Sequence, residues 1–130
     1  MALALKLSKL GQGGVGANPM VGCVISSDDK IIAKDYHHHY GQEHAEINAL
    51  NQIKHKADNC KLYVTLEPCS MCFGALYWSQ ISRIVYSAKD KKNEFNGYQL
   101  KIHPKTTIEG GVLANQTEIM LKEFFKSKRS

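Results

Sequence analysis

The chain has 130 residues, of which 43% are hydrophobic and 22% are charged. This length predicts one domain over residues 1–130, and the composition is that of a globular protein with a single core. No stretch of about 18 apolar residues occurs, so we expect no transmembrane helix. Lys6 and Lys9 interrupt the apolar start of the chain, which lacks the apolar run of a signal peptide. We therefore expect a cytoplasmic protein without membrane contact.

The formal net charge of the chain is +5. An excess of lysine and arginine is compatible with a phosphate-bearing ligand or with RNA. The four cysteines are Cys23, Cys60, Cys69 and Cys72. In a cytosolic protein such a pattern is more typical of a metal site or of catalysis than of disulfide bonds.

Hydrophobic periodicity and turn residues predict alternating helices and strands along the chain. The predicted elements are a helix at 2–10, a glycine-rich loop at 11–16, strands at 21–25 and 31–36, a polar loop at 37–43, a helix beginning near His44, a strand at 62–66, a helix at about 69–79, a strand at 84–87, a loop at 88–103 and a helix at 115–126. This alternation predicts an α/β sandwich built on a mixed sheet.

Two short motifs, His44-x-Glu46 and Pro68-Cys69-x-x-Cys72, carry residues that suit metal chemistry. Together they match the signature of zinc-dependent nucleobase deaminases. In the first turn of a helix, cysteines three apart place both sulfurs on one face, where the helix dipole favours thiolates. Because zinc binds cysteine sulfur and histidine nitrogen readily, the predicted ligands are His44, Cys69 and Cys72. Three protein ligands leave one tetrahedral position for water, which is the catalytic pattern.

Glu46 is the predicted catalytic residue. A carboxylate beside an activated water can take its proton and pass it to a leaving amine. The predicted reaction is hydrolytic: water attacks the ring carbon that bears the amine, and Glu46 protonates a ring nitrogen and then the departing ammonia. Residues two apart in a regular helix point roughly 200° apart, so His44 must lie at or before the first turn for both side chains to reach one site.

Two other interpretations fit part of this pattern. A Cys-x-x-Cys motif after a strand and at a helix start also describes thiol redox sites, but His44 and Glu46 have no role there. A structural zinc site would need a fourth protein ligand, which Cys23 or a histidine of the run 37–39 could supply.

The chain closely resembles the cytidine and deoxycytidylate deaminase superfamily over about residues 17–125, most specifically in Leu62-Tyr-Val-Thr-Leu-Glu-Pro-Cys-Ser-Met-Cys72. The resemblance implies a three-layer α/β/α sandwich with a central mixed sheet and one catalytic Zn²⁺ per chain. It also implies that the backbone N–H groups of Ala45 and Cys69 hold the attacking oxygen. By the same analogy, an isolated domain with the apolar stretch 73–78 is expected to form a homodimer.

Within this superfamily, Asn18-Pro-Met-Val-Gly-Cys-Val-Ile25 and Tyr36-His37-x-x-x-Gly41 resemble the deaminase domain of riboflavin biosynthesis. That resemblance implies that Asn18 and His37 line the substrate pocket. In that family a Gly-Arg/Lys-Thr-Pro-Pro insert between the zinc cysteines helps to hold a phosphate. The insert is absent from this chain.

Other parts of the sequence resemble those of bacterial tRNA adenosine deaminases, which bind an anticodon loop with their last helix. These parts are the Cys-x-x-Cys spacing, Ser87-Ala-Lys-Asp90 and the basic end at 122–129. That family's pocket asparagine is replaced here by His37. The stretch 73–78 resembles bacterial guanine deaminases. The main prediction is a small nucleobase, nucleoside or nucleotide-like substrate, such as the diaminopyrimidine of riboflavin synthesis, cytosine or guanine. The alternative is adenosine-to-inosine deamination at the wobble position of tRNA.

The remaining candidate residues have simpler interpretations. Asn18 can also act as a turn residue before a proline, and His37 can be a surface residue. The other residues of interest are assigned as follows: His38 and His39 to a solvated loop, Cys23 and Cys60 to the core, Tyr77 and Trp78 to the core or a subunit interface, Lys126–Arg129 to a solvated helix end, and 88–103 to one wall of the pocket.

Overall fold

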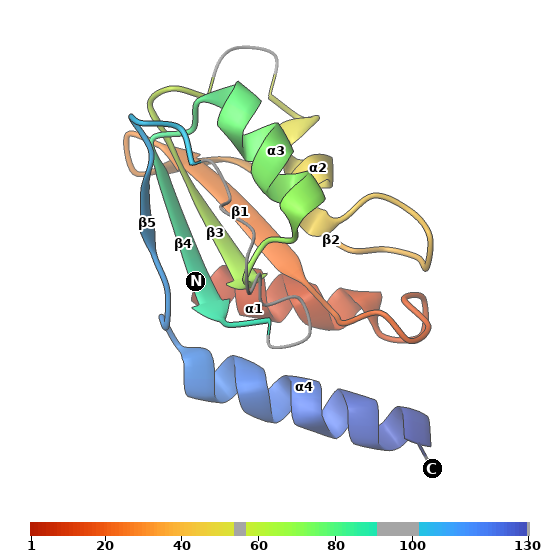
Figure 1. Ribbon diagram of the computed structural model, residues 1–130. Coiled ribbons are helices and arrows are strands. Elements are labelled where there is room, and N and C mark those ends of the chain that lie inside the picture. The colour runs from red at the N-terminus through yellow and green to blue at the C-terminus, as the bar shows by residue number, and fades with distance from the viewer. Residues whose placement is uncertain (54–56, 91–101, 130) are drawn as a thin grey trace.

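The computed structural model describes residues 1–53, 57–90 and 102–129. Figure 1 shows their arrangement around one sheet. In chain order the elements are α1 (Ala2–Ser8), η1 (Lys9–Gly11), β1 (Gly22–Ser27), β2 (Lys30–Tyr36), α2 (Ala45–Leu50), β3 (Cys60–Leu66), α3 (Ser70–Ser79), β4 (Arg83–Ala88), β5 (Thr107–Glu109) and α4 (Ala114–Arg129).

The described strands form one mixed sheet in the order β2-β1-β3-β4-β5. β1 runs antiparallel to β2 and β3, whereas β3, β4 and β5 run parallel to one another. Asp28 and Asp29, both with positive φ, connect β1 to β2 in the left-handed conformation that tight hairpins require. The predicted mixed sheet is confirmed.

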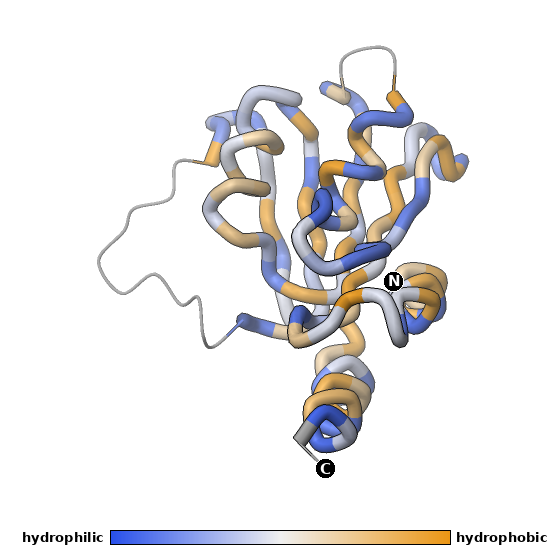
Figure 2. The backbone as a smooth tube through the Cα atoms, turned by 90° about the vertical axis from the view of Figure 1, so that its right-hand side faces the viewer, coloured by the Kyte–Doolittle hydropathy of each residue, from blue (hydrophilic) through white to orange (hydrophobic). Residues whose placement is uncertain are grey.

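Helices cover both faces of this sheet. α2 and α3 contribute Ala49 and Leu76 to the main core, which also contains Leu62 of β3. On the opposite face α1 and α4 meet in a smaller cluster around Met120 and Phe124. Figure 2 shows the hydrophobic residues concentrated along the strands and on one side of α4. The predicted three-layer α/β/α sandwich is therefore confirmed.

Two glycines let separate segments approach closely at the edge of the sheet. A Cβ on Gly22 would collide with the carbonyl oxygen of Ala4, so only glycine lets α1 pack directly on β1. A Cβ on Gly11 would lie 2.5 Å from the carbonyl oxygen of His37. The predicted glycine-rich loop thus packs directly behind the segment that carries His37.

Several predicted boundaries need correction. The first helix ends at Ser8 and tightens into a 3₁₀ turn, because the chain must then enter the glycine-rich loop. α3 begins at Ser70 and not at Cys69, and α4 extends beyond the predicted end at 126. β5 was not predicted: it has three residues with exposed side chains, which is too short for a periodic signal.

The interpretation of Trp78 as a core residue is wrong, because this side chain is 83% exposed. Of the predicted loop at 88–103, residues 91–101 lie outside the described residues, so its role as a pocket wall stays a prediction there. None of the helices in the described part of the chain is long and apolar enough to cross a membrane.

Candidate active site

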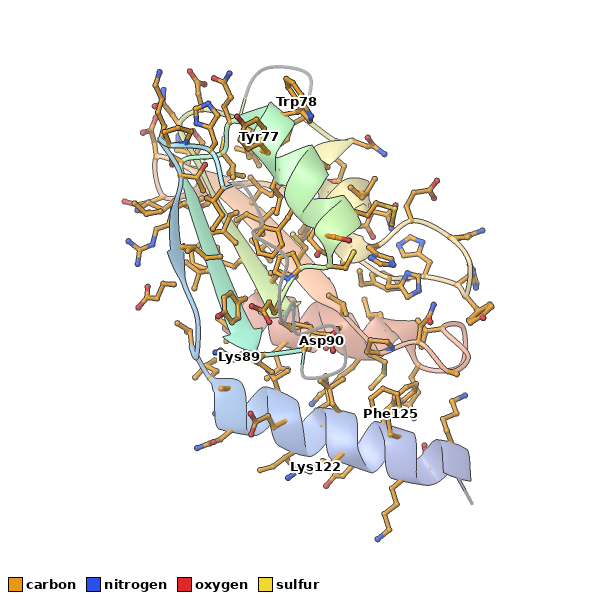
Figure 3. All side chains as sticks on the ribbon, viewed as in Figure 1. Tyr77, Trp78, Lys89, Asp90, Lys122 and Phe125 are labelled. Carbon is orange, nitrogen blue, oxygen red and sulfur yellow. The ribbon has the colours of Figure 1, made fainter. Side chains whose placement is uncertain are left out.

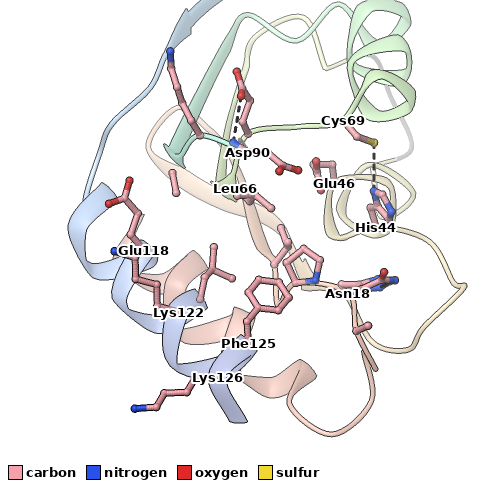
Figure 4. A pocket seen from close by; sticks show the side chains of 18 residues that line it. Asn18, His44, Glu46, Leu66, Cys69, Asp90, Glu118, Lys122, Phe125 and Lys126 are labelled. Atoms are coloured by element: carbon pink, nitrogen blue, oxygen red, sulfur yellow. Dashed lines mark hydrogen bonds between the residues drawn. The ribbon is translucent and has the colours of Figure 1, made fainter. Parts of the chain in front are cut away.

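The sheet topology brings separate segments of the chain to one edge. β3 and β4 run parallel, so their carboxyl ends lie side by side, where Leu66 pairs with Ala88. β1 runs antiparallel to both neighbours, so its start and the end of β2 reach the same edge, where Gly22 pairs with Tyr36. A cavity of about 720 Å³ lies beyond this edge, and Figure 4 shows the side chains that line it. Pockets of this size bind small-molecule ligands.

One group of side chains in this region has the composition of a metal site. The donor atoms of His44, Cys69 and Cys72 all lie within 4.8 Å of one another. His44 Nδ1 is 3.5 Å from Cys69 Sγ and 3.4 Å from Cys72 Sγ. Two thiols and one imidazole nitrogen converging on a single point match the ligand preference of zinc. The donor set therefore fits a zinc ion.

The starts of two helices position these three residues. His44 is the N-cap of α2, with an extended backbone, and Cys69 is the N-cap of α3. Cys72 lies in the first turn of α3. The requirement that His44 precede the first turn is met, and this lets His44 and Glu46 face one site although they are two residues apart. Cys69 shares that site from the cap position and not from within the helix.

The hydrogen bond between the thiols of Cys69 and Cys72 shifts their pKa values in opposite directions. This bond from the Cys72 thiol lowers the pKa of Cys69 to about 3, and a hydrogen bond with His44 acts in the same direction. The same contact, together with burial, raises the pKa of Cys72. Metal binding requires thiolates, so a zinc ion held by this cluster would displace the proton of Cys72.

Glu46 lies beside the cluster with 3% of its surface exposed. Burial raises the pKa of its carboxyl group above the ordinary value, against the opposing effects of hydrogen bonds and of nearby His44. Glu46 also lines the cavity. A carboxyl group with a raised pKa, next to the cluster of His44, Cys69 and Cys72 and open to a cavity, is suited to accept a proton and pass it on.

Asn18 and His37 lie together beside the cluster, because the ring of His37 meets the ring of His44 edge to face, with 5.5 Å between the ring centres. Asn18 Nδ2 is 3.2 Å from His37 Nε2, and His37 Nδ1 is 3.0 Å from the carbonyl oxygen of Glu43. The interpretation of His37 as a surface residue is wrong, because only 3% of it is exposed. Asn18 lies in a bend, as its turn interpretation predicts, and its side chain also lines the cavity.

The other candidates lie away from the cluster. Among the residues that the structure describes, no further His, Cys, Asp or Glu joins His44, Cys69 and Cys72, which argues against a closed structural zinc site. Cys23 and Cys60 are buried core thiols, as predicted. His39 is exposed, whereas His38 is half-exposed and forms an ion pair with Asp35.

Ala45 is fully buried at the first helical position of α2, where backbone N–H groups have no partner within the helix.

Part of the cavity wall was not predicted. α4 contributes Glu118, Leu121, Lys122, Phe125 and Lys126, and Glu67 lies just after the end of β3. In the sequence, the basic residues near the end of this helix are its most prominent feature. Glu118, Leu121, Lys122 and Phe125 recur at intervals of three or four residues, and this spacing is the signal that marks one helix face.

The comparisons with known proteins agree with this geometry. Residues 1–88 match the family model described as the cytidine and deoxycytidylate deaminase zinc-binding region. The chain belongs to this deaminase family. The match includes His44, Cys69 and Cys72, which form the cluster, and Glu46, which lines the cavity.

Relatives of this deaminase include the diaminohydroxyphosphoribosylamino-pyrimidine deaminase of Buchnera aphidicola subsp. Schizaphis graminum. It is 36% identical over 138 residues, covering 100% of this chain and 94% of that protein. The riboflavin biosynthesis protein RibD of Escherichia coli is also 36% identical, over 100% of this chain but only 38% of its own length. The chain thus spans nearly the whole of one relative and well under half of the other.

Solved structures have the same fold. A diaminohydroxyphosphoribosylaminopyrimidine deaminase/reductase of Thermotoga maritima superposes with a TM-score of 0.82 at 27% identity, covering 97% of this chain and 39% of that one. A tRNA:A34 deaminase superposes with a TM-score of 0.73 at 24% identity, over 93% of this chain and 97% of that one, which shows the fold alone. The prediction of a zinc-dependent hydrolytic deaminase acting on a ring amino group is confirmed.

Proposed function

We propose that this deaminase acts on a small aminopyrimidine that carries a phosphoribosylamino group. In the reaction water adds to the ring carbon, the C–N bond breaks, the amine leaves as ammonia and a ring carbonyl remains. The observation that carries the proposal is the grouping of His44, Cys69 and Cys72 beside buried Glu46 at one end of a large cavity. The choice of substrate is supported by relatives that bear that name at 36% identity over the full chain.

In this proposal His44, Cys69 and Cys72 hold one zinc ion. When bound, zinc supplies the Lewis acidity that makes water a nucleophile near neutral pH. Glu46 takes the proton of that water and delivers it to the departing amine. Its burial supports this role, because a raised pKa brings the carboxyl group closer to the working pH.

Asn18 and His37 would hold the pyrimidine ring. The carbonyl oxygen of Glu43 can only accept a hydrogen bond, so His37 carries its proton on Nδ1 and accepts at Nε2 from the Asn18 amide. The Asn18 carbonyl oxygen then remains as an acceptor, which suits a ring rich in amino groups. The N–H group of Ala45, at the start of α2, would hold the attacking oxygen.

We further propose that residues 1–130 form one deaminase domain that assembles as a homodimer in the cytoplasm. The exposed face of α3 supports the dimer, since Met71 and Trp78 are 63% and 83% exposed and lie two turns apart. The predicted interface stretch at 73–78 is only partly available, because Phe73 and Leu76 are buried in the core. Four free cysteines suit a reducing compartment.

Ammonia release by the zinc-loaded protein tests the substrate. The panel contains the phosphoribosyl diaminopyrimidine, cytosine and guanine compounds, and an anticodon stem-loop with adenosine at the wobble position. We expect turnover of the diaminopyrimidine. Turnover of the stem-loop alone would overturn this proposal in favour of the tRNA alternative, and turnover of cytosine or guanine alone would assign a different small substrate. Glu46→Gln is the control for contaminating activity.

A further inference from the structure

Two faces of α4 contact different parts of the protein. Thr117, Met120 and Phe124 are buried against the protein, and Thr117 Oγ1 bonds Ser87 Oγ of β4 at 2.7 Å. A second face lies toward the cavity and contributes Leu121, Lys122 and Phe125 among its lining residues. Figure 3 shows Lys122 and Phe125 on this helix, and Glu46 of α2 lines the same cavity. The last helix is therefore a wall of the active site and not only a cover for the sheet.

The chemistry of this wall changes along its surface. Leu121 and Phe125 are half-buried and present apolar surface to the cavity. Figure 4 shows Phe125 facing the interior, whereas Glu118 and Lys122 lie together at the rim and Lys126 extends away. A ligand that fills the cavity would contact the cluster of His44, Cys69 and Cys72 at one end, an apolar surface in the middle and charged side chains at the rim.

A cationic group is available at that rim. The ion pairs among the described residues are His38–Asp35 and Arg83–Glu109, so Lys122 takes part in none of them. Lys89, the residue after β4, lines the same cavity. Two lysines from different elements therefore line one cavity, and their ammonium groups suit an anion such as a phosphate monoester. A cavity of about 720 Å³ is also much larger than a single pyrimidine ring needs.

We propose that Lys122, with Lys89, binds a phosphate group of the substrate, and that Phe125 packs against the sugar between that phosphate and the ring. The inference rests on the proposed function for the ring itself. Recognition of the phosphate would then lie on α4, which is far in sequence from Cys69 and Cys72.

Binding of a substrate fragment tests the phosphate site without any turnover. Ribose 5-phosphate and ribose are titrated into the isotope-labelled protein, and amide shifts are followed by NMR, which reads millimolar dissociation constants. We expect ribose 5-phosphate to bind and ribose to bind at least tenfold more weakly. Lys122→Ala should weaken ribose 5-phosphate binding by roughly ten- to a hundredfold, as loss of a charged hydrogen bond predicts, and Lys122→Arg should retain most of it.

Lys128→Ala is the matched control, because Lys128 is an exposed lysine of the same helix that does not line the cavity. It should leave the affinity for ribose 5-phosphate unchanged. Equal losses in Lys122→Ala and Lys128→Ala would reduce the effect to general charge and overturn the proposal. Failure of the wild-type protein to bind ribose 5-phosphate would also overturn it.

A kinetic comparison separates this inference from the proposed function. For the phosphoribosyl diaminopyrimidine, Lys122→Ala should raise KM roughly ten- to a hundredfold with little change in kcat. For the dephosphorylated substrate neither constant should change. Absence of turnover with both substrates, while ribose 5-phosphate binding still depends on Lys122, would defeat the proposed function and leave the phosphate site standing. Lys122-dependent binding of an anticodon stem-loop without binding of ribose 5-phosphate would assign the cation to RNA and overturn the inference.

Discussion

Asn18 Nδ2 lies 3.2 Å from His37 Nε2, although the two residues are 19 positions apart in the sequence. The loop that carries His37 is in turn fixed by the bond from His37 Nδ1 to the Glu43 carbonyl oxygen, just before the start of α2. The two predicted pocket residues thus form one unit with the helix that carries Glu46. A change at Asn18 should therefore affect substrate binding without disturbing the metal cluster.

We expect Asn18→Ala to lower kcat/KM by roughly ten- to a hundredfold, because the substrate loses its hydrogen-bond partner and His37 loses its donor. The zinc content should stay at the wild-type level. Steady-state ammonia release and metal analysis measure the two effects. Asn115→Ala, at the exposed start of α4, is the control and should behave like wild type. Unchanged kinetics in Asn18→Ala would remove this residue from the substrate pocket.

Gly11→Ala should destabilise the protein by about 1–3 kcal/mol. The new Cβ would lie 2.5 Å from the carbonyl oxygen of His37, so one of the two segments must move. Denaturant unfolding gives the change in free energy. Gly74→Ala is the matched control: its Cβ would meet nothing within 4 Å on α3, and alanine is the better helix former there by up to about 1 kcal/mol. Equal stability of the two variants would contradict the close approach at Gly11.

Cys72→Ser should weaken zinc binding by more than roughly a hundredfold, since it removes one of the three proposed ligands. Competition with a chelator measures the affinity, and elemental analysis measures the zinc content. Cys60→Ser replaces another buried thiol outside the cluster and should keep one zinc per chain. Retention of wild-type affinity in Cys72→Ser would show that the zinc lies elsewhere.

Trp78→Ser should shift the protein from dimer to monomer at micromolar concentration. Trp78 is the most exposed of the large hydrophobic side chains in the described residues, and an indole of this exposure is a typical interface anchor. Size-exclusion chromatography with light scattering reads the mass. Tyr40→Ser removes another aromatic side chain, 67% exposed, from a different part of the surface and should leave the dimer intact. A monomeric wild-type protein would refute the dimer directly.

Local signals in the sequence predicted much of the fold and the centre of the site. The hairpin strands and the third strand have strong periodic patterns, and the two motifs around His44 and Cys69 are short and specific. Their pairing across the fold followed from the chemistry of zinc, which needs ligands from both motifs.

What the sequence missed depends on contacts between distant segments. β5 is a strand because Thr107 and Ile108 pair with β4, and nothing in three exposed residues indicates that pairing. The place of α4 beside the cavity depends on the buried contact between Ser87 and Thr117, which are 30 positions apart. The cap position of Cys69 differs by one residue from the predicted helix start, which is within the ordinary uncertainty of helix boundaries.

The most direct test of the account is the turnover of Glu46→Gln with zinc bound. Glutamine has the same shape as glutamate but cannot carry the proton from water to the leaving amine. We predict a zinc content equal to that of wild type and ammonia release from the phosphoribosyl diaminopyrimidine reduced by roughly a hundred- to ten-thousandfold. Wild-type turnover by a folded, zinc-loaded Glu46→Gln protein would contradict the mechanism at its centre.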